Sequence, residues 1–179
     1  SLLLPILHHP NPLFILGFVS LELLHDTSFG IRYLIVLHSI SFLFLVITYF
    51  IFPKGDIQHS SVKIVSPFTT AIKDTIQPIT IVATTIIFFS TINVIISHFI
   101  SHYFETIPSL LQLILSSSLE ITNGIFTAYQ FLPIDALTLF LVFYLTTQSL
   151  SIHIQVYVIA KEQMISMVPY ILLRILFSI

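Results

Sequence analysis

Two short polar stretches interrupt otherwise apolar parts of this chain, and their side chains are of the types that bind solutes by hydrogen bonds. The first, EITNG, runs from Glu120 to Gly124, and the second, LSIHIQV, contains Ser151, His153 and Gln155. A carboxylate accepts hydrogen bonds, whereas a primary amide and a neutral imidazole both donate and accept them. Because a carboxylate in hydrocarbon is costly, we expect Glu120 to face protein, water or a solute.

Both polar stretches follow apolar runs that are shorter than the roughly 20 residues needed to cross a bilayer. Gly124 can adopt a positive φ and end a helix, and Asn123 tolerates the same turn. Irregular backbone at membrane depth persists only where it is buried in protein or lines a watery cavity, and many secondary transporters build solute sites from discontinuous helices. We therefore predict that the two breaks meet inside a helical bundle, with Glu120 and Asn123 facing His153 and Gln155.

The candidate solute-binding residues are Glu120, Asn123, Gly124, Ser151, His153, Gln155 and Arg174. Arg174 either pairs with Glu120 across the bundle as a counter-charge or extends to an interface near the chain end. A competing interpretation is that these polar groups join membrane helices to one another by hydrogen bonds and bind no solute. For the serine and threonine positions, this packing interpretation is the favoured one.

A third set of candidate residues, His98 and His102, has the i, i+4 spacing that places two imidazoles on one helix face, as a metal site needs. The chain has no cysteine and no HExxH sequence, so we expect no metal here and no cofactor elsewhere. No P-loop, GxSxG or Rossmann sequence occurs either, and we expect no enzymatic activity.

Composition places the chain in the membrane class. It is 56% hydrophobic and only 8% charged, whereas soluble domains carry about 25% charged residues. A soluble fold could not cover so much apolar surface with so few charges, so the lipid bilayer is the expected surrounding. With a net charge of −2 and six Lys and Arg in total, the chain has no basic surface for nucleic acid.

The apolar runs predict an all-α fold, a polytopic transmembrane bundle with broken or re-entrant helices and about four to six membrane segments. Leu13–Leu24 is too short to cross and is expected to be a half-helix or re-entrant segment, followed by a turn capped by Asp26. Ile31–Phe52 and Pro78–Phe104 are expected full spans. Between them lies a polar connection, 53–77, with a short interfacial helix that opens at Pro67. Its three lysines predict a cytoplasmic location.

Several sequence stretches together resemble the C-terminal half of the sporulation integral membrane protein YlbJ family. They are NPLFILGFVSLELL near the start, LEITNGI in the middle, and LSIHIQV followed by YILLRIL at the end. The family groups with nucleoside-recognition or gate-domain proteins, which include parts of concentrative nucleoside transporters and of the FeoB iron transporter. Asn11–Gly17 is similar to the family's small-residue loop, Glu120–Gly124 to its EITNG segment and Leu150–Gln155 to its LSIHxQ segment. Tyr170 and Arg174 fall in the helix that follows.

The resemblance implies a multi-pass protein of a bacterial plasma membrane that moves or gates a small polar, nucleoside-like solute, with a link to spore formation. It also implies that 1–179 is a single gate-like membrane domain, half of a longer two-repeat protein. A homo-oligomer or a separate N-terminal half would then complete the pathway. The alternative function is a non-transporting structural or assembly subunit of the membrane. Two departures from the family pattern are Gln148–Ser149, where the family has a glycine pair, and Asn11, where it has a small residue.

Overall fold

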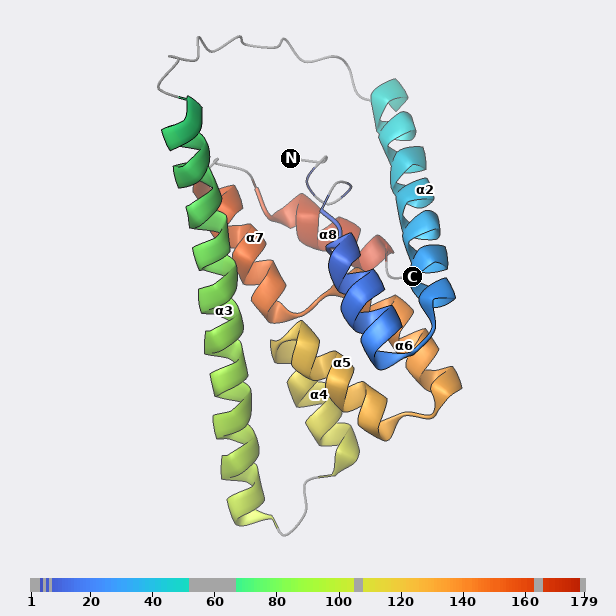
Figure 1. Ribbon diagram of the computed structural model, residues 1–179, viewed down its shortest axis with the longest axis vertical. Coiled ribbons are helices and arrows are strands. Elements are labelled where there is room, and N and C mark those ends of the chain that lie inside the picture. Colours follow the sequence, from blue (N-terminus) through green and yellow to red (C-terminus); the bar gives the residue numbers. More distant parts are fainter. Residues whose placement is uncertain are drawn as a thin grey trace.

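The computed structural model describes residues 4, 6, 8–51, 67–104, 108–162 and 166–177. Within these ranges the regular structure is helical throughout and no strand occurs, which confirms the predicted all-α bundle (Figure 1). The elements, in chain order, are the π-helix η1 (Phe14–Leu23) and the α-helices α2 (Thr27–Ile51), α3 (Pro67–Tyr103), α4 (Ser109–Leu119), α5 (Ile121–Phe131), α6 (Ile134–Thr147), α7 (Leu150–Glu162) and α8 (Val168–Phe177).

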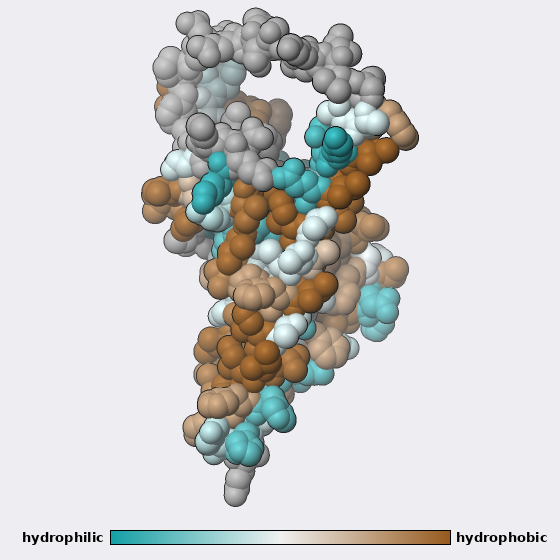
Figure 2. Space-filling model, turned by 90° about the vertical axis from the view of Figure 1, so that its left-hand side faces the viewer, coloured by the Kyte–Doolittle hydropathy of each residue, from teal (hydrophilic) through white to brown (hydrophobic). Residues whose placement is uncertain are grey.

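Among the described residues, three stretches are long and apolar enough to cross a membrane: Thr27–Ile51, Phe68–Tyr103 and Ile134–Lys161. The first two flank the molecule, and the shorter helices lie between them (Figure 1). Only 11% of the most apolar window of each flanking helix is buried against protein, compared with 44% for the third stretch. Brown, apolar surface accordingly covers much of the face that α3 presents, with teal near its ends (Figure 2). Length and composition therefore indicate a membrane protein.

Helix α3 corrects one expected boundary. We expected a short interfacial helix from Pro67 and a separate span from Pro78, but α3 is a single helix of 37 residues with Pro78 inside it. Ending a helix leaves four backbone N–H and four C=O groups without helical partners at the break. Continuing through a proline forfeits one hydrogen bond and kinks the helix locally. In an apolar run, continuing the helix through Pro78 therefore costs less free energy than ending it there. Residues 53–66 of the expected connection lie outside the described part.

The N-terminal hairpin pairs η1 with α2. In η1 the backbone hydrogen bonds join residues that are five apart in sequence. One example is the Leu24 N–H, which donates to the Val19 carbonyl over 3.0 Å. Asp26 then accepts the N–H of Ser28 at 2.9 Å and caps the start of α2, as predicted. Gly30 of α2 lies directly against the Ser20 side chain of η1 with no room for a Cβ. This close approach holds the short apolar segment against a full-length helix.

The hydrophobic core lies where η1, α2, α5 and α6 meet. Its most deeply buried members, each 0% exposed, are Ile15 and Val19 of η1, Ile125 and Ala128 of α5, and Leu141 and Leu145 of α6. Between membrane helices such side chains act mainly through close van der Waals packing, because lipid tails are as apolar as the core. The core thus fixes η1, α5 and α6 relative to one another, and with them the ends of the helices at which the polar residues lie.

Candidate functional site

The first helix break is confined to one residue, Glu120, which connects α4 to α5. Its backbone is extended, with φ −143° and ψ 135°, and the two helices pack closely against each other (Figure 1). The Glu120 side chain caps α5, because its Oε2 accepts the backbone N–H of Asn123 at 3.0 Å. The sequence predicted a break within 116–124, and the structure narrows it to the carboxylate itself.

Gly124 does not end a helix, which corrects our prediction for it. It lies inside α5, and no glycine among the described residues has a positive φ. A Cβ on Gly124 would lie 2.6 Å from Ser117 Cα and would collide with the Tyr144 hydroxyl. That hydroxyl is 2.7 Å from the Ser117 carbonyl oxygen and 3.2 Å from that of Glu120. The glycine is therefore needed for the close approach of α4, α5 and α6 at the Glu120 turn.

The second helix break consists of Gln148 and Ser149, between α6 and α7. Gln148 has φ 67° and ψ 170°, a backbone region that is essentially restricted to glycine. His153 and Gln155, which we placed in the broken stretch, instead lie inside α7. The break thus falls at the pair of residues where the resembling family has glycines, although this chain carries none there.

The first break and the N-terminal half of α7 meet at a cavity of about 240 Å³, which the second break, Gln148–Ser149, does not line. It brings together three of the predicted residues, Glu120 from the first break and Ser151 and Gln155 from the start of α7. Its complete lining is Pro10, Asn11, Phe14, Val82, Ile86, Glu120, Ile121, Thr122, Ser151, Ile152 and Gln155. Glu120 is only 1% exposed, and its Oε1 has no hydrogen-bond partner. A buried acceptor without a partner costs about 1–3 kcal/mol, more for a charged group, which makes this atom the chemically distinctive feature of the cavity.

The two amides of the predicted set bind helix α3. Asn123 Nδ2 donates to Ser90 Oγ at 3.0 Å, and Gln155 Nε2 donates to Thr85 Oγ1 at 2.8 Å. Asn123 does not line the cavity, whereas Gln155 does. The bond to α3 uses one of the two N–H groups of Nε2, so Gln155 still has one N–H and its carbonyl oxygen for other partners. Part of the predicted polarity therefore joins helices, as the competing interpretation held.

His153 and Arg174 lie away from the Glu120 cavity. Ser151 and Gln155 are four residues apart and share a face of α7, whereas His153, two residues from each, projects from the other side. Its ring centroid is 5.7 Å from that of Tyr170 in α8. Arg174 neither pairs with Glu120 nor reaches an interface, the two alternatives we considered. It is 3% exposed, and its Nη1 donates to the Thr146 carbonyl at 3.3 Å.

The histidines His98 and His102 lie on the exposed end of α3, beside Phe99 and Tyr103. Across the described ranges no three His, Cys, Asp or Glu side chains come together in a group that could hold a metal ion. The pair therefore has no third ligand there.

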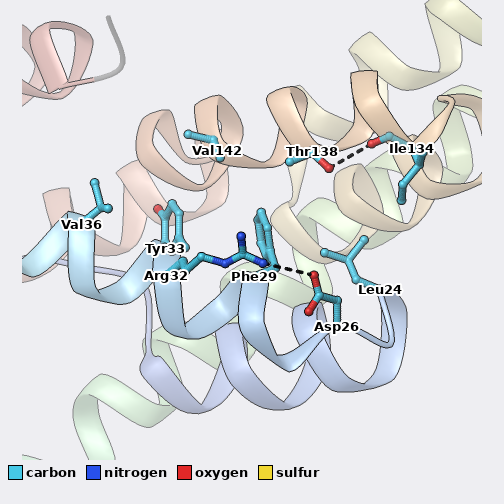
Figure 3. A pocket seen from close by; sticks show the side chains of 9 residues that line it. All are labelled: Leu24, Asp26, Phe29, Arg32, Tyr33, Val36, Ile134, Thr138 and Val142. Atoms are coloured by element: carbon cyan, nitrogen blue, oxygen red, sulfur yellow. Dashed lines mark hydrogen bonds and ion pairs between the residues drawn. The ribbon is translucent and has the colours of Figure 1, made fainter.

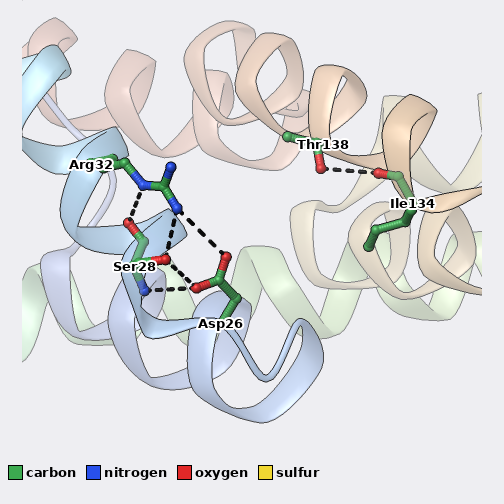
Figure 4. Close-up of polar contacts among 5 residues, drawn as sticks. All are labelled: Asp26, Ser28, Arg32, Ile134 and Thr138. Carbon is green, nitrogen blue, oxygen red and sulfur yellow. Dashed lines mark hydrogen bonds and ion pairs between the residues drawn. The ribbon is translucent and has the colours of Figure 1, made fainter.

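A second hollow, of about 400 Å³, opens between α2 and α6 and is mainly apolar (Figure 3). Its charged groups satisfy each other at one end. Arg32 Nη2 donates to Ser28 Oγ at 2.7 Å and lies 4.0 Å from Asp26 Oδ2 (Figure 4). The hydrogen bond from the Ser28 hydroxyl holds the pKa of Asp26 below its usual value. Because these charges are exposed and already paired, this hollow offers a solute less than the Glu120 cavity does.

Sequence reasoning missed three residues that shape the site: Asn11 in the cavity wall, and Tyr144 and Gly30 at close helix contacts. The sequence did contain a pattern that could have identified Asn11 as a site residue, because it lies between two prolines that end the preceding apolar segment. No such pattern marks Tyr144, because a tyrosine in an apolar run is typical of any membrane helix.

Comparison with known proteins found no matching family model, no matching curated protein and no matching solved structure. The resemblance to the YlbJ family therefore stays a prediction.

Proposed function

We propose that this chain is a multi-pass protein of a bacterial plasma membrane that binds a small polar solute in the Glu120 cavity and gates its movement. The observation that carries the proposal is Glu120, 1% exposed and with a partnerless Oε1, at a helix break that lines a cavity. Interrupted helices near the membrane midplane are how many secondary transporters bind their solutes. The link to spore formation rests on the family resemblance alone.

The chemistry of the cavity favours a solute that donates hydrogen bonds. An ionised carboxylate only accepts them, and Gln155 has its carbonyl oxygen and one N–H left to offer. The Ser151 hydroxyl lies 3.0 Å from Ser149 Oγ and can turn to either role. An amine, a hydroxyl-rich solute or a nucleoside-like compound meets these demands, and 240 Å³ is below the roughly 300–1,000 Å³ of drug-sized pockets.

Uptake into proteoliposomes tests the proposal, with labelled nucleosides, amines and sugars as the panel. Glu120→Gln keeps an oxygen that can cap α5 but removes the charge from the cavity. We expect this variant to fold and to lose uptake at least about ten-fold, the effect of roughly 1.4 kcal/mol in solute binding. Glu22→Gln, at an exposed carboxylate of η1, is the matched control and should transport normally. Equal uptake by Glu120→Gln and the unaltered protein would remove Glu120 from the site.

A structural or assembly role is the second candidate, and the interhelical amide bonds favour it. Asn123 and Gln155 both bond to α3, and Asn93 of α3 lies 3.4 Å from Ser116 of α4. In that role Glu120→Gln would leave any partner complex intact, whereas Asn123→Ala would lower the amount of protein in the membrane. Complementation of a deletion strain with each variant, scored for membrane level and for spore formation, separates the two functions.

A further inference from the structure

A second buried polar cluster surrounds Arg174, on the other side of the Gln148–Ser149 break. Arg174 is 3% exposed, and one of its nitrogens, Nη1, donates to the Thr146 carbonyl. The guanidinium carbon lies 5.6 Å from the ring centroid of Tyr170. The other two nitrogens, Nε and Nη2, have no hydrogen-bond partner. An arginine this deeply buried in a membrane protein marks a functional site by default.

The two free nitrogens lie on one edge of the guanidinium plane. Their N–H bonds point the same way in a rigid fork, the geometry that matches two oxygens of a carboxylate or a phosphate. The remaining nitrogen, used by Thr146, lies off this edge. The structure therefore leaves open the one edge of Arg174 that binds an oxyanion through two parallel hydrogen bonds.

Tyr170 connects this arginine to further polar groups. Its ring centroid is 6.0 Å from that of His8 and 5.7 Å from that of His153. Its hydroxyl is 3.4 Å from Gln148 Oε1, which turns the Gln148 amide toward the cluster. The polar atoms in the cluster thus come from the segment before η1, from the break between α6 and α7, and from α8.

Further buried polar atoms without partners lie around Arg174, and each of them can donate a hydrogen bond. Arg174 acts electrostatically on His9, His153 and Tyr33, which places all three near its charge. The Tyr33 hydroxyl and Gln148 Nε2 are buried without partners, as is one ring nitrogen of each histidine, Nδ1. The amide nitrogen only donates, the hydroxyl can donate, and an imidazole nitrogen takes either role. Arg174 Nε, Arg174 Nη2 and Gln148 Nε2 can only donate, so the partner that these three nitrogens lack is an acceptor.

No carboxylate among the described residues supplies that acceptor. The ion pair found there joins Asp26 to Arg32, and the buried Glu120 faces its own cavity. A buried cation without a counter-charge costs several kcal/mol. We propose that Arg174 binds a carboxylate or phosphate group on its Nε–Nη2 edge, with Gln148 as a further donor. This oxyanion site is separate from the Glu120 cavity and does not depend on the proposed transport.

Thermal unfolding of the purified full chain in a non-ionic detergent tests the oxyanion site, followed by circular dichroism at 222 nm. Acetate, phosphate and chloride are added at equal ionic strength. We expect acetate or phosphate to raise the melting temperature by roughly 5 °C at a hundred-fold excess over the dissociation constant. The stronger of the two identifies the oxyanion. Chloride, which cannot bridge both nitrogens as two oxygens do, should have a much smaller effect.

Two variants make the result specific to Arg174. Arg174→Lys keeps the charge but loses the fork, and should weaken oxyanion binding at least ten-fold, whereas Arg32→Lys, at an exposed arginine, should respond normally. Gln148→Glu places a carboxylate beside Arg174 and should raise the melting temperature without added anion while abolishing the response. The proposal is overturned if neither oxyanion stabilises the protein, if chloride does so equally, or if Gln148→Glu responds as the unaltered chain does.

Discussion

At the scale of single residues, Glu120 combines two tasks in one carboxylate. Its Oε2 caps α5 through the Asn123 N–H, and its Oε1 is left without a partner in the cavity. The cap holds the carboxylate rigidly at the turn, so the free oxygen is presented in a fixed position. Pre-organisation of this kind lowers the cost of binding a solute. The neighbouring Gly124 makes the turn compact enough for Tyr144 to reach its carbonyls.

Replacing Gly124 tests this close packing. In Gly124→Ala the new methyl would lie 2.6 Å from Ser117 Cα, a backbone atom that cannot move alone. We expect a loss of about 1–3 kcal/mol in the free energy of unfolding, measured by thermal or denaturant melts in detergent. Gly17→Ala in η1 is the matched control, because a methyl group added there would have no neighbouring atom within 4 Å. Alanine there should be neutral or stabilising by up to about 1 kcal/mol. Equal effects of the two substitutions would contradict the packing role.

At the scale of elements, the break between α6 and α7 holds Gln148 in a backbone conformation that residues other than glycine disfavour. Gln148 has φ 67° and ψ 170°, which costs a residue other than glycine about 1–3 kcal/mol. The surrounding structure has to overcome this strain. The core residues Leu141 and Leu145 hold α6, while Ser151 and Val156, buried on α7, hold the other half. The break is therefore imposed by packing on both sides rather than by a local helix-ending signal.

Gln148→Gly should accordingly stabilise the protein. It removes the backbone strain and the partnerless Nε2, and it gives up the 3.4 Å contact with Tyr170. We expect the free energy of unfolding to rise by roughly 1 kcal/mol, seen as an increase of about 2–4 °C in melting temperature. Gln112→Gly, within the regular helix α4, should instead lower the free energy of unfolding by roughly 1 kcal/mol. A fall in stability for Gln148→Gly would show that its side-chain contacts outweigh the strain.

How far the sequence predicts these elements depends on which signal each one carries. Long apolar runs predicted α2 and the span in α3, and polar residues in short apolar runs located both breaks. The exact break residues, Glu120, Gln148 and Ser149, were not predicted because none of them is a glycine. Gly124, the glycine that was expected to end a helix, instead allows close packing of helices. His153 was grouped with Gln155 because they are close in sequence, although helical spacing separates their faces. For Arg174 the sequence left two alternatives, Glu120 and an interface, and the three-dimensional arrangement of α8 gives neither.

At the scale of the whole molecule, two long apolar helices enclose the short ones that build the cavity. The exposed flanks of α2 and α3, which lie on either side of the short helices (Figure 1), suit lipid, and the buried Glu120 and Arg174 belong to the shorter elements between them. With 37 residues, α3 is roughly 55 Å long, well beyond the roughly 30 Å of a bilayer's hydrocarbon core. One end must therefore extend past the membrane or the helix must tilt. The charged pair Lys73 and Asp74, both exposed, indicates that the N-terminal end is the part that extends.

Labelling of single cysteines tests this placement, and the absence of native cysteine makes each substitution unambiguous. Lys73 and His102 lie roughly 44 Å apart along a straight helix. If α3 crosses the membrane, the two residues therefore lie on opposite sides of the bilayer. A membrane-impermeant maleimide should react with Lys73→Cys from the cytoplasmic side and with His102→Cys from the other. Ile87→Cys is the control that reports lipid, because Ile87 is 67% exposed on the protein yet should resist labelling until detergent is added. If both end positions react from the same side, α3 does not cross the membrane, and the cavity between its neighbours cannot lie on a path through it.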